Sequence, residues 1–165
     1  MDLRRFWRHL AMTPGRARRC FPDATMDAIQ REIAALEERH RGELVFVVEA
    51  ELDTAELWRD VSSRDRAREV FSMQGVWNTE ENNGVLLYVL LSDHHVEIVA
   101  DRGIDARVGP EAWRAICDEI DRSFHNGRYE EGALAGVRAI STLLIRHFPA
   151  EGRGVNELGD RPIRL

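Results

Sequence analysis

Two uninterrupted apolar runs constrain the fold of this chain more than any other feature. Residues 43–50 read ELVFVVEA and residues 85–93 read VLLYVLLSD. A strand with one face in water alternates apolar and polar residues, whereas these runs stay apolar between their polar ends, which is typical of strands buried on both faces. We therefore expect a central β-sheet with helices on each side.

The order of the elements predicts a mixed sheet. A helical pattern at 54–74 separates the two runs, which indicates a parallel pair joined by a right-handed crossover. The short turn SDHH then leads into VEIVA at 96–100, so this second pair is antiparallel. Further helical patterns occupy 21–42, 109–127 and 128–148. The predicted class is α/β, a three-layer α/β/α sandwich on a small mixed β-sheet of three to four strands.

The length of 165 residues suits one domain with a sizeable core. We divide the chain into a basic N-terminal segment (1–20), an α/β domain (21–148) and a flexible C-terminal tail (149–165). The tail is assigned because it contains proline, glycine and charged residues without any periodicity.

The N-terminal segment carries six arginines and one acid, Asp2, and a short amphipathic helix is predicted at 3–11. Leu3, Phe6, Trp7 and Leu10 have helical spacing, and two interpretations stay open. The helix lies on an anionic membrane or contacts a protein partner, or its apolar stripe packs on the domain's own core. In the first case the contact residues are Arg4, Arg5, Phe6, Trp7 and Arg8.

Composition argues against several classes of function. The net charge of −6 disfavours a nucleic-acid partner, and the two cysteines lack the spacing of a zinc site or disulfide framework. No apolar run is long enough to span a membrane, and the N-terminus lacks the apolar stretch of a secretory signal. We expect a cytoplasmic monomer, peripheral at the inner face of the membrane if residues 3–11 bind lipid.

Acids and amides gather at the ends of the predicted hairpin. The start of one antiparallel strand lies beside the end of the next, so Glu81, Asn82 and Asn83 should face Asp101 and Asp105. Carboxylate and amide oxygens on loops suit a hard cation such as Ca²⁺ or Mg²⁺. The alternative is that these residues only form solvated turns. The orientation of Arg102 decides much of this question, because its charge can take the place of a cation.

Three motifs in the same region resemble the TPM domain family. They are NNGVLL at 82–87, VEIVADRGI at 96–104, and the spaced residues Phe124, Gly127, Tyr129, Gly132 and Gly136. The resemblance extends from about residue 21 to residue 148. Asn83 and Asp105 match family positions, Asn82 stands where an acid is common, and Asp101-Arg102-Gly103 replaces a G-x-G turn.

The resemblance implies an α/β/α sandwich and several functions. Some members bind calcium or a similar ion, a plant thylakoid relative is a weak acid phosphatase, and an animal relative is an auxiliary receptor subunit. We expect a domain that binds a divalent cation and supports interactions with an unidentified protein partner. The alternatives are a weak metal-assisted acid phosphatase and a peripheral membrane module, and no catalytic residue can be assigned.

Overall fold

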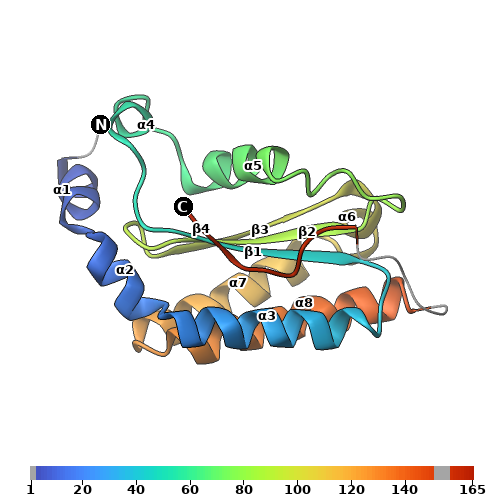
Figure 1. The fold of residues 1–165 in the computed structure, drawn as a ribbon. Coiled ribbons are helices and arrows are strands. Elements are labelled where there is room, and N and C mark those ends of the chain that lie inside the picture. The colour runs from blue at the N-terminus through green and yellow to red at the C-terminus, as the bar shows by residue number, and fades with distance from the viewer. Residues whose placement is uncertain (1–2, 151–156) are drawn as a thin grey trace.

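A four-stranded open sheet forms the middle of three layers in the computed structural model, which describes residues 3–150 and 157–165 (Figure 1). The strand order is β3-β2-β1-β4. β1 (Glu43–Glu49) is parallel to β2 (Gly84–Leu90), and β2 is antiparallel to β3 (His95–Ala100). The predicted mixed sheet is confirmed.

Helices cover both faces of the sheet (Figure 1). One face carries α3 (Asp23–Glu37), α7 (Pro110–His125) and α8 (Tyr129–His147), and the other carries α4 (Thr54–Trp58) and α5 (Ser63–Met73). Successive strand residues point to opposite faces, so each strand contributes to two cores. Leu44 and Phe46 join the core with α3 and α8, whereas Val45 and Val47 join the core with α5. Burial on both faces explains why β1 and β2 contain no alternating polar residues.

Two glycines let α8 approach α7 closely. A Cβ atom at Gly132 would lie 2.8 Å from the Ser123 Cβ, and one at Gly136 would lie 2.4 Å from the Ile120 Cδ1. The absence of a side chain at both positions therefore allows the two helices to pack closely.

Several short elements differ from the sequence prediction. The pattern at 54–74 divides into α4 and α5, because the chain turns at Asp60 with a positive φ of 56°. α6 (Arg102–Val108) follows β3 directly, where we expected only a loop. Asp101 caps its start, and Gly109, with a φ of 83°, ends it. Seven residues are too few for a clear periodic signal.

The N-terminal segment forms two helices, α1 (Leu3–Ala11) and α2 (Pro14–Cys20). Only the first of them was predicted. α2 begins here because the Thr13 hydroxyl accepts a hydrogen bond from the Arg16 amide and Pro14 occupies the first helical position.

The end of the chain adds an edge strand that we did not predict. β4 (Ile163–Arg164) pairs in parallel with β1, and the Leu165 amide donates to the Val48 carbonyl at 3.0 Å. The predicted tail thus includes part of the sheet, because this segment satisfies backbone groups along the edge of β1. Residues 1–2 of the predicted N-terminal segment and 151–156 of the tail lie outside the described residues.

Candidate functional site

The turn before β2 meets the start of α6 at one end of the sheet, as the antiparallel pairing predicts. The Asp101 amide donates to the Gly84 carbonyl at 2.8 Å, and the Ile104 amide donates to the Asn82 carbonyl at 3.2 Å. The structure therefore places Glu81, Asn82 and Asn83 beside Asp101. We call this set of four residues, together with Asp105, the hairpin-end site.

Two side chains of the hairpin-end site have arginine partners. The Glu81 carboxylate forms an ion pair with Arg41 at 2.9 Å, and both side chains are about one-third exposed. The Arg102 Nε donates to the Asn82 Oδ1 at 3.2 Å. Arg102 is thus directed at the amide of Asn82, and the charges nearest the turn are partly balanced without a metal ion.

The two aspartates of the site have different surroundings. The Asp105 Oδ1 accepts a hydrogen bond from the Trp113 Nε1 at 3.0 Å, so this carboxylate faces α7. The Asp101 Oδ1 accepts from the Arg102 amide at 2.7 Å, as an N-cap residue does. Sequence reasoning identified the position of Asp101 but missed its role as a helix cap.

Two buried oxygens of the hairpin-end site have no hydrogen-bond partner among the residues described. They are the Oδ2 of Asp101 and the Oδ1 of Asn83. Asn83 is only 1% exposed, and its Nδ2 donates to the Arg41 carbonyl at 2.9 Å, which leaves the amide oxygen free to accept. A buried acceptor without a partner costs free energy, so each such atom requires an explanation.

Backbone oxygens of the turn come close to Gly103, at the start of α6. A Cβ at Gly103 would lie 2.5 Å from the Asn82 carbonyl oxygen and 2.7 Å from that of Glu81. Glycine is therefore required at 103 for the turn to approach α6. Within residues 3–150 and 157–165, no group of three or more His, Cys, Asp or Glu side chains has a metal-binding arrangement. Any cation here must rely on amide and carbonyl oxygens for most of its ligands.

A second polar cluster lies at the opposite end of the β2–β3 hairpin and holds α1. The Arg5 guanidinium binds the Asp93 carboxylate through Nε at 2.9 Å and Nη2 at 2.7 Å, and the His9 Nε2 lies 3.1 Å from Asp93 Oδ1. Burial favours a raised pKa for Asp93, but hydrogen bonds with His9 and Arg5 outweigh it and hold that pKa well below its ordinary range. We call Arg5, His9 and Asp93 the α1 anchor.

Ser92 completes a Ser-His-Asp set that is structural. The Ser92 Oγ lies 3.0 Å from the His9 Nδ1, but that nitrogen also accepts the Leu52 amide at 3.0 Å. In a nucleophilic triad the serine and the acid occupy opposite ring nitrogens, and the serine reaches substrate. Here Nδ1 is held by the backbone, and Ser92 and His9 are each 1% exposed.

α1 docks through its polar side rather than through its apolar stripe. Arg5 and His9 face the domain, and of the apolar residues only Phe6 packs against a core. The rest of the stripe faces water, with exposed fractions of 65%, 63% and 61% for Leu3, Trp7 and Leu10. The interpretation that the stripe packs on the domain's own core is therefore wrong except for Phe6.

The five predicted membrane or partner contacts divide into two groups. Arg5 and Phe6 contact the domain itself, whereas Arg4, Trp7 and Arg8 are exposed. Arg8 reaches Asp93 at 3.4 Å with a half-exposed side chain. Sequence reasoning missed Asp93, although an acid that directly follows a buried strand is a signal for a cationic partner.

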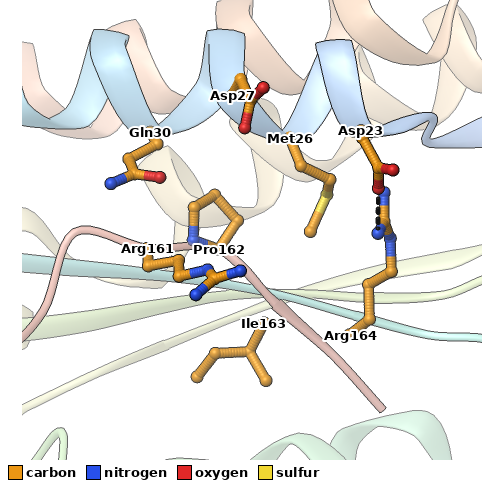
Figure 2. A pocket seen from close by; sticks show the side chains of 8 residues that line it. All are labelled: Asp23, Met26, Asp27, Gln30, Arg161, Pro162, Ile163 and Arg164. Atoms are coloured by element: carbon orange, nitrogen blue, oxygen red, sulfur yellow. Dashed lines mark hydrogen bonds and ion pairs between the residues drawn. The ribbon is translucent and has the colours of Figure 1, made fainter.

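Two cavities among the described residues contain none of the predicted cation ligands. One has a volume of about 470 Å³ and includes the ion pair of Asp23 and Arg164 at 2.6 Å. It lies where α3 faces the C-terminal segment (Figure 2). Another of about 340 Å³ lies beside the α1 anchor and has a mixed lining: Arg5, Arg8, Asp60, Ser62, Ser63, Asp93 and His95. Arg164 in the first cavity, and Arg5 and Arg8 in the second, are already paired with acids.

The C-terminal segment brings several carboxylates together. The amides of Glu157 and Leu158 donate to the Glu43 carboxylate at 2.9 and 3.2 Å. Burial, a hydrogen bond with Asp160 and the charge of Glu43 raise the pKa of Glu37 to about 9, against the donation from the Leu44 amide. Glu37 is therefore protonated in the folded protein at neutral pH.

We expect the substitution Glu37→Gln to flatten the pH dependence of stability. A raised pKa in the folded state contributes stability that is complete below the unfolded value, near 4.5, and is lost as the pH rises toward about 9. Between about pH 6 and pH 8 the wild type should lose about 3 kcal/mol relative to Glu37→Gln in urea unfolding. The exposed neighbour Glu38 supplies the control Glu38→Gln; parallel curves for wild type and Glu37→Gln would contradict the expectation.

Comparison with known proteins finds a matching family model and similar solved structures. The family model described as the TPM domain matches residues 18–143. The NMR structure of the BA42 protein from the psychrophilic bacterium Bizionia argentinensis superposes with a TM-score of 0.72 and 27% identity, over 86% of this chain and 93% of that one. The N-terminal domain of a P. gingivalis protein has a TM-score of 0.63 and 23% identity, over 81% and 83%. No curated protein matches.

Proposed function

The chain belongs to the TPM domain family, and we propose that its hairpin-end site binds a divalent cation where β2 begins and β3 ends. The observation that carries this proposal is the pair of buried oxygens without partners, Asp101 Oδ2 and Asn83 Oδ1. A cation there would supply what both atoms lack. The carbonyls of Glu81 and Asn82, which approach Gly103, are further oxygens of the same turn.

The donor set fits a hard cation that accepts neutral oxygens. Calcium takes six to eight oxygen ligands in a flexible arrangement, including backbone and amide carbonyls, whereas magnesium demands a strict octahedron. Asp101 would supply the charge, Asn83 its amide oxygen, and the turn one or more carbonyls. Asp105 is left out of this set, because its carboxylate is bound to Trp113.

The charge count limits the affinity. One carboxylate without a competing arginine holds calcium weakly, so we expect a dissociation constant of about 10⁻⁴–10⁻³ M, the range of weak modules. Glu81 joins the set only if it exchanges Arg41 for the cation. In this proposal the cation has a structural role, which is to fix the turn at 79–83 against α6 and to shape the surface offered to a protein partner.

Thermal unfolding with calcium tests the proposal. A ligand that binds only the folded state raises the unfolding free energy, by about 1.4 kcal/mol when its concentration is tenfold above the dissociation constant. We expect millimolar calcium to stabilise the wild type and to have no effect on Asp101→Asn. Asp105→Asn is the matched control: its amide oxygen can still accept from the Trp113 Nε1, only the charge is removed, and the response to calcium should be kept.

An NMR titration locates the effect. We expect the amides of Asn83 and Asp101–Gly103 to shift with calcium and those of the α1 anchor to stay in place. No stabilisation and no shifts with calcium or magnesium would overturn the proposal. Turnover of a generic phosphomonoester that Asp101→Asn abolishes would show instead that the site is a metal-assisted phosphatase.

A further inference from the structure

The exposed face of α1 carries large apolar side chains, because the opposite face is fixed to the domain. Arg5, Phe6 and His9 occupy the side of the helix that meets the domain, and the α1 anchor fixes that side to a buried acid. The opposite side therefore presents its apolar residues outward, at positions i, i+4 and i+7: Leu3, Trp7 and Leu10. We call these three residues the α1 stripe.

Exposure of the α1 stripe is a property of the docked helix. The Arg5 Nη2 donates to the Val61 carbonyl at 2.7 Å, and its Nη1 lies 3.8 Å from Asp60. These contacts place α1 beside the loop that follows α4, and Trp58, the last residue of α4, is 66% exposed. Large apolar side chains left in water at one corner of a domain mark an interaction surface.

The positive charge around the α1 stripe indicates the kind of partner that this surface binds. Arg4 and Arg8 are exposed beside the α1 stripe on the same helix, and three more exposed arginines follow on α2: Arg16, Arg18 and Arg19. The whole chain carries a net charge of −6, so this basic corner contrasts with an acidic remainder. A second copy of the chain docked α1 against α1 would bring these arginines together, and their repulsion disfavours it.

We propose that α1 is a preformed site for an anionic membrane surface. Leucine and tryptophan enter the boundary between headgroups and acyl chains, where the amphipathic indole is favoured, while the arginines bind lipid phosphates. The helix axis then lies parallel to the bilayer. α1 precedes the residues that match the family model, so this site is independent of the cation proposal.

The geometry also sets the strength and form of binding. The helix has nine residues, so it buries little area and the affinity is modest. Attraction between arginines and anionic headgroups adds to it and weakens as salt screens the charges. Because the acidic remainder of the domain is repelled by the same membrane, we expect a single orientation with α1 against the lipid.

Vesicle binding by the full chain tests this inference. Phosphatidylcholine vesicles that contain phosphatidylglycerol should co-sediment the wild type, and vesicles of phosphatidylcholine alone should not. Trp7→Gln should weaken binding by about tenfold or more, since one buried tryptophan contributes at least that much. Trp77→Gln is the matched control, because Trp77 is 56% exposed at the other end of α5 and should bind as the wild type does.

Each other outcome overturns the inference. Equal binding of Trp7→Gln and wild type would place the lipid contact elsewhere. Equal binding to both vesicle types would remove the role of charge. Binding to neither would assign the α1 stripe to a protein, which is a dimer partner if sedimentation shows a wild-type dimer that Trp7→Gln dissociates. Circular dichroism of Trp7→Gln confirms that the variant is folded, so a loss of binding is not a loss of structure.

Discussion

Asp93→Asn should lower the free energy of unfolding by about 3 kcal/mol, because it leaves a buried guanidinium without its counter-charge. Asp93 is 8% exposed, Arg5 is 15% exposed in its side chain, and two hydrogen bonds of 2.9 Å or less join them. The replacement keeps the shape of the side chain and removes only its charge. Urea unfolding followed by far-ultraviolet circular dichroism measures the difference.

The pH dependence of this difference has a definite sign. The pKa of Asp93 is depressed in the folded state, because hydrogen bonds with His9 and Arg5 outweigh burial. Its contribution is therefore complete above the unfolded value, near 3.8, and is lost as the pH falls through the lower folded value. Wild type and Asp93→Asn should thus converge in stability under strong acid and differ most near neutral pH.

Glu97→Gln is the matched control for the Asp93 prediction. Glu97 is also an acid of this hairpin with an arginine partner, Arg64 at 3.4 Å, but the Arg64 side chain is 44% exposed. A pair of this kind contributes about 0–1 kcal/mol. Hydrogen exchange gives a second measure, because α1 should lose protection in Asp93→Asn and the α3 core at Ile33 should change less. Equal destabilisation by the two variants would contradict the role assigned to the α1 anchor.

The central sheet was predictable because strands that are buried on both faces have nearly continuous apolar sequences. Every position of β1 and β2 is buried, and between Leu44 and Val48 and between Val85 and Leu90 the only polar side-chain group is the Tyr88 hydroxyl, which donates to Glu49. β4 and α6 have no comparable sequence pattern. β4 has two residues and forms because β1 has an open edge, so its stabilisation comes from a segment more than a hundred residues away.

The hairpin-end site was predictable in position and not in chemistry. Antiparallel pairing alone brings Asn83 next to Asp101. Which oxygens remain free depends on side chains from other parts of the chain, since Arg41 binds Glu81 and Trp113 binds Asp105. Local sequence carries no information on those rotamers.

The orientation of α1 was also not predictable from local sequence. Periodicity predicts the helix correctly, and the usual rule that an apolar stripe faces the core predicts the wrong docking for Leu3, Trp7 and Leu10. The rule fails because a buried carboxylate without a cationic partner costs more free energy than a short helix loses when its apolar stripe stays in water. Arg5 and Asp93 are 88 positions apart, so only the tertiary structure brings them together.

Gly84→Ala should lower the free energy of unfolding by about 3 kcal/mol, because the new methyl group meets backbone rather than a movable side chain. A Cβ at Gly84 would lie 2.0 Å from the Val76 carbonyl oxygen and 3.0 Å from the Val76 Cγ1. Val76 is fully buried in the core beneath α5 and cannot move aside without repacking it. Urea unfolding provides the measurement.

Moving Gly84 instead of Val76 is equally costly, and this is why the effect should be large. Gly84 is paired with Glu43 in β1, and its carbonyl accepts the Asp101 amide at 2.8 Å, so a shift disturbs both neighbouring strands at the hairpin-end site. The control is Gly15→Ala in α2, where the nearest atom is 4.0 Å away and alanine should be neutral or stabilise by about 0.5–1 kcal/mol. If the Gly84→Ala protein were as stable as Gly15→Ala, the 76–84 loop could shift to admit the methyl group at little cost in free energy. The turn at 79–83 would then be too soft to hold the Asn83 oxygen in place for a cation, and the site would have to be formed by the ion itself.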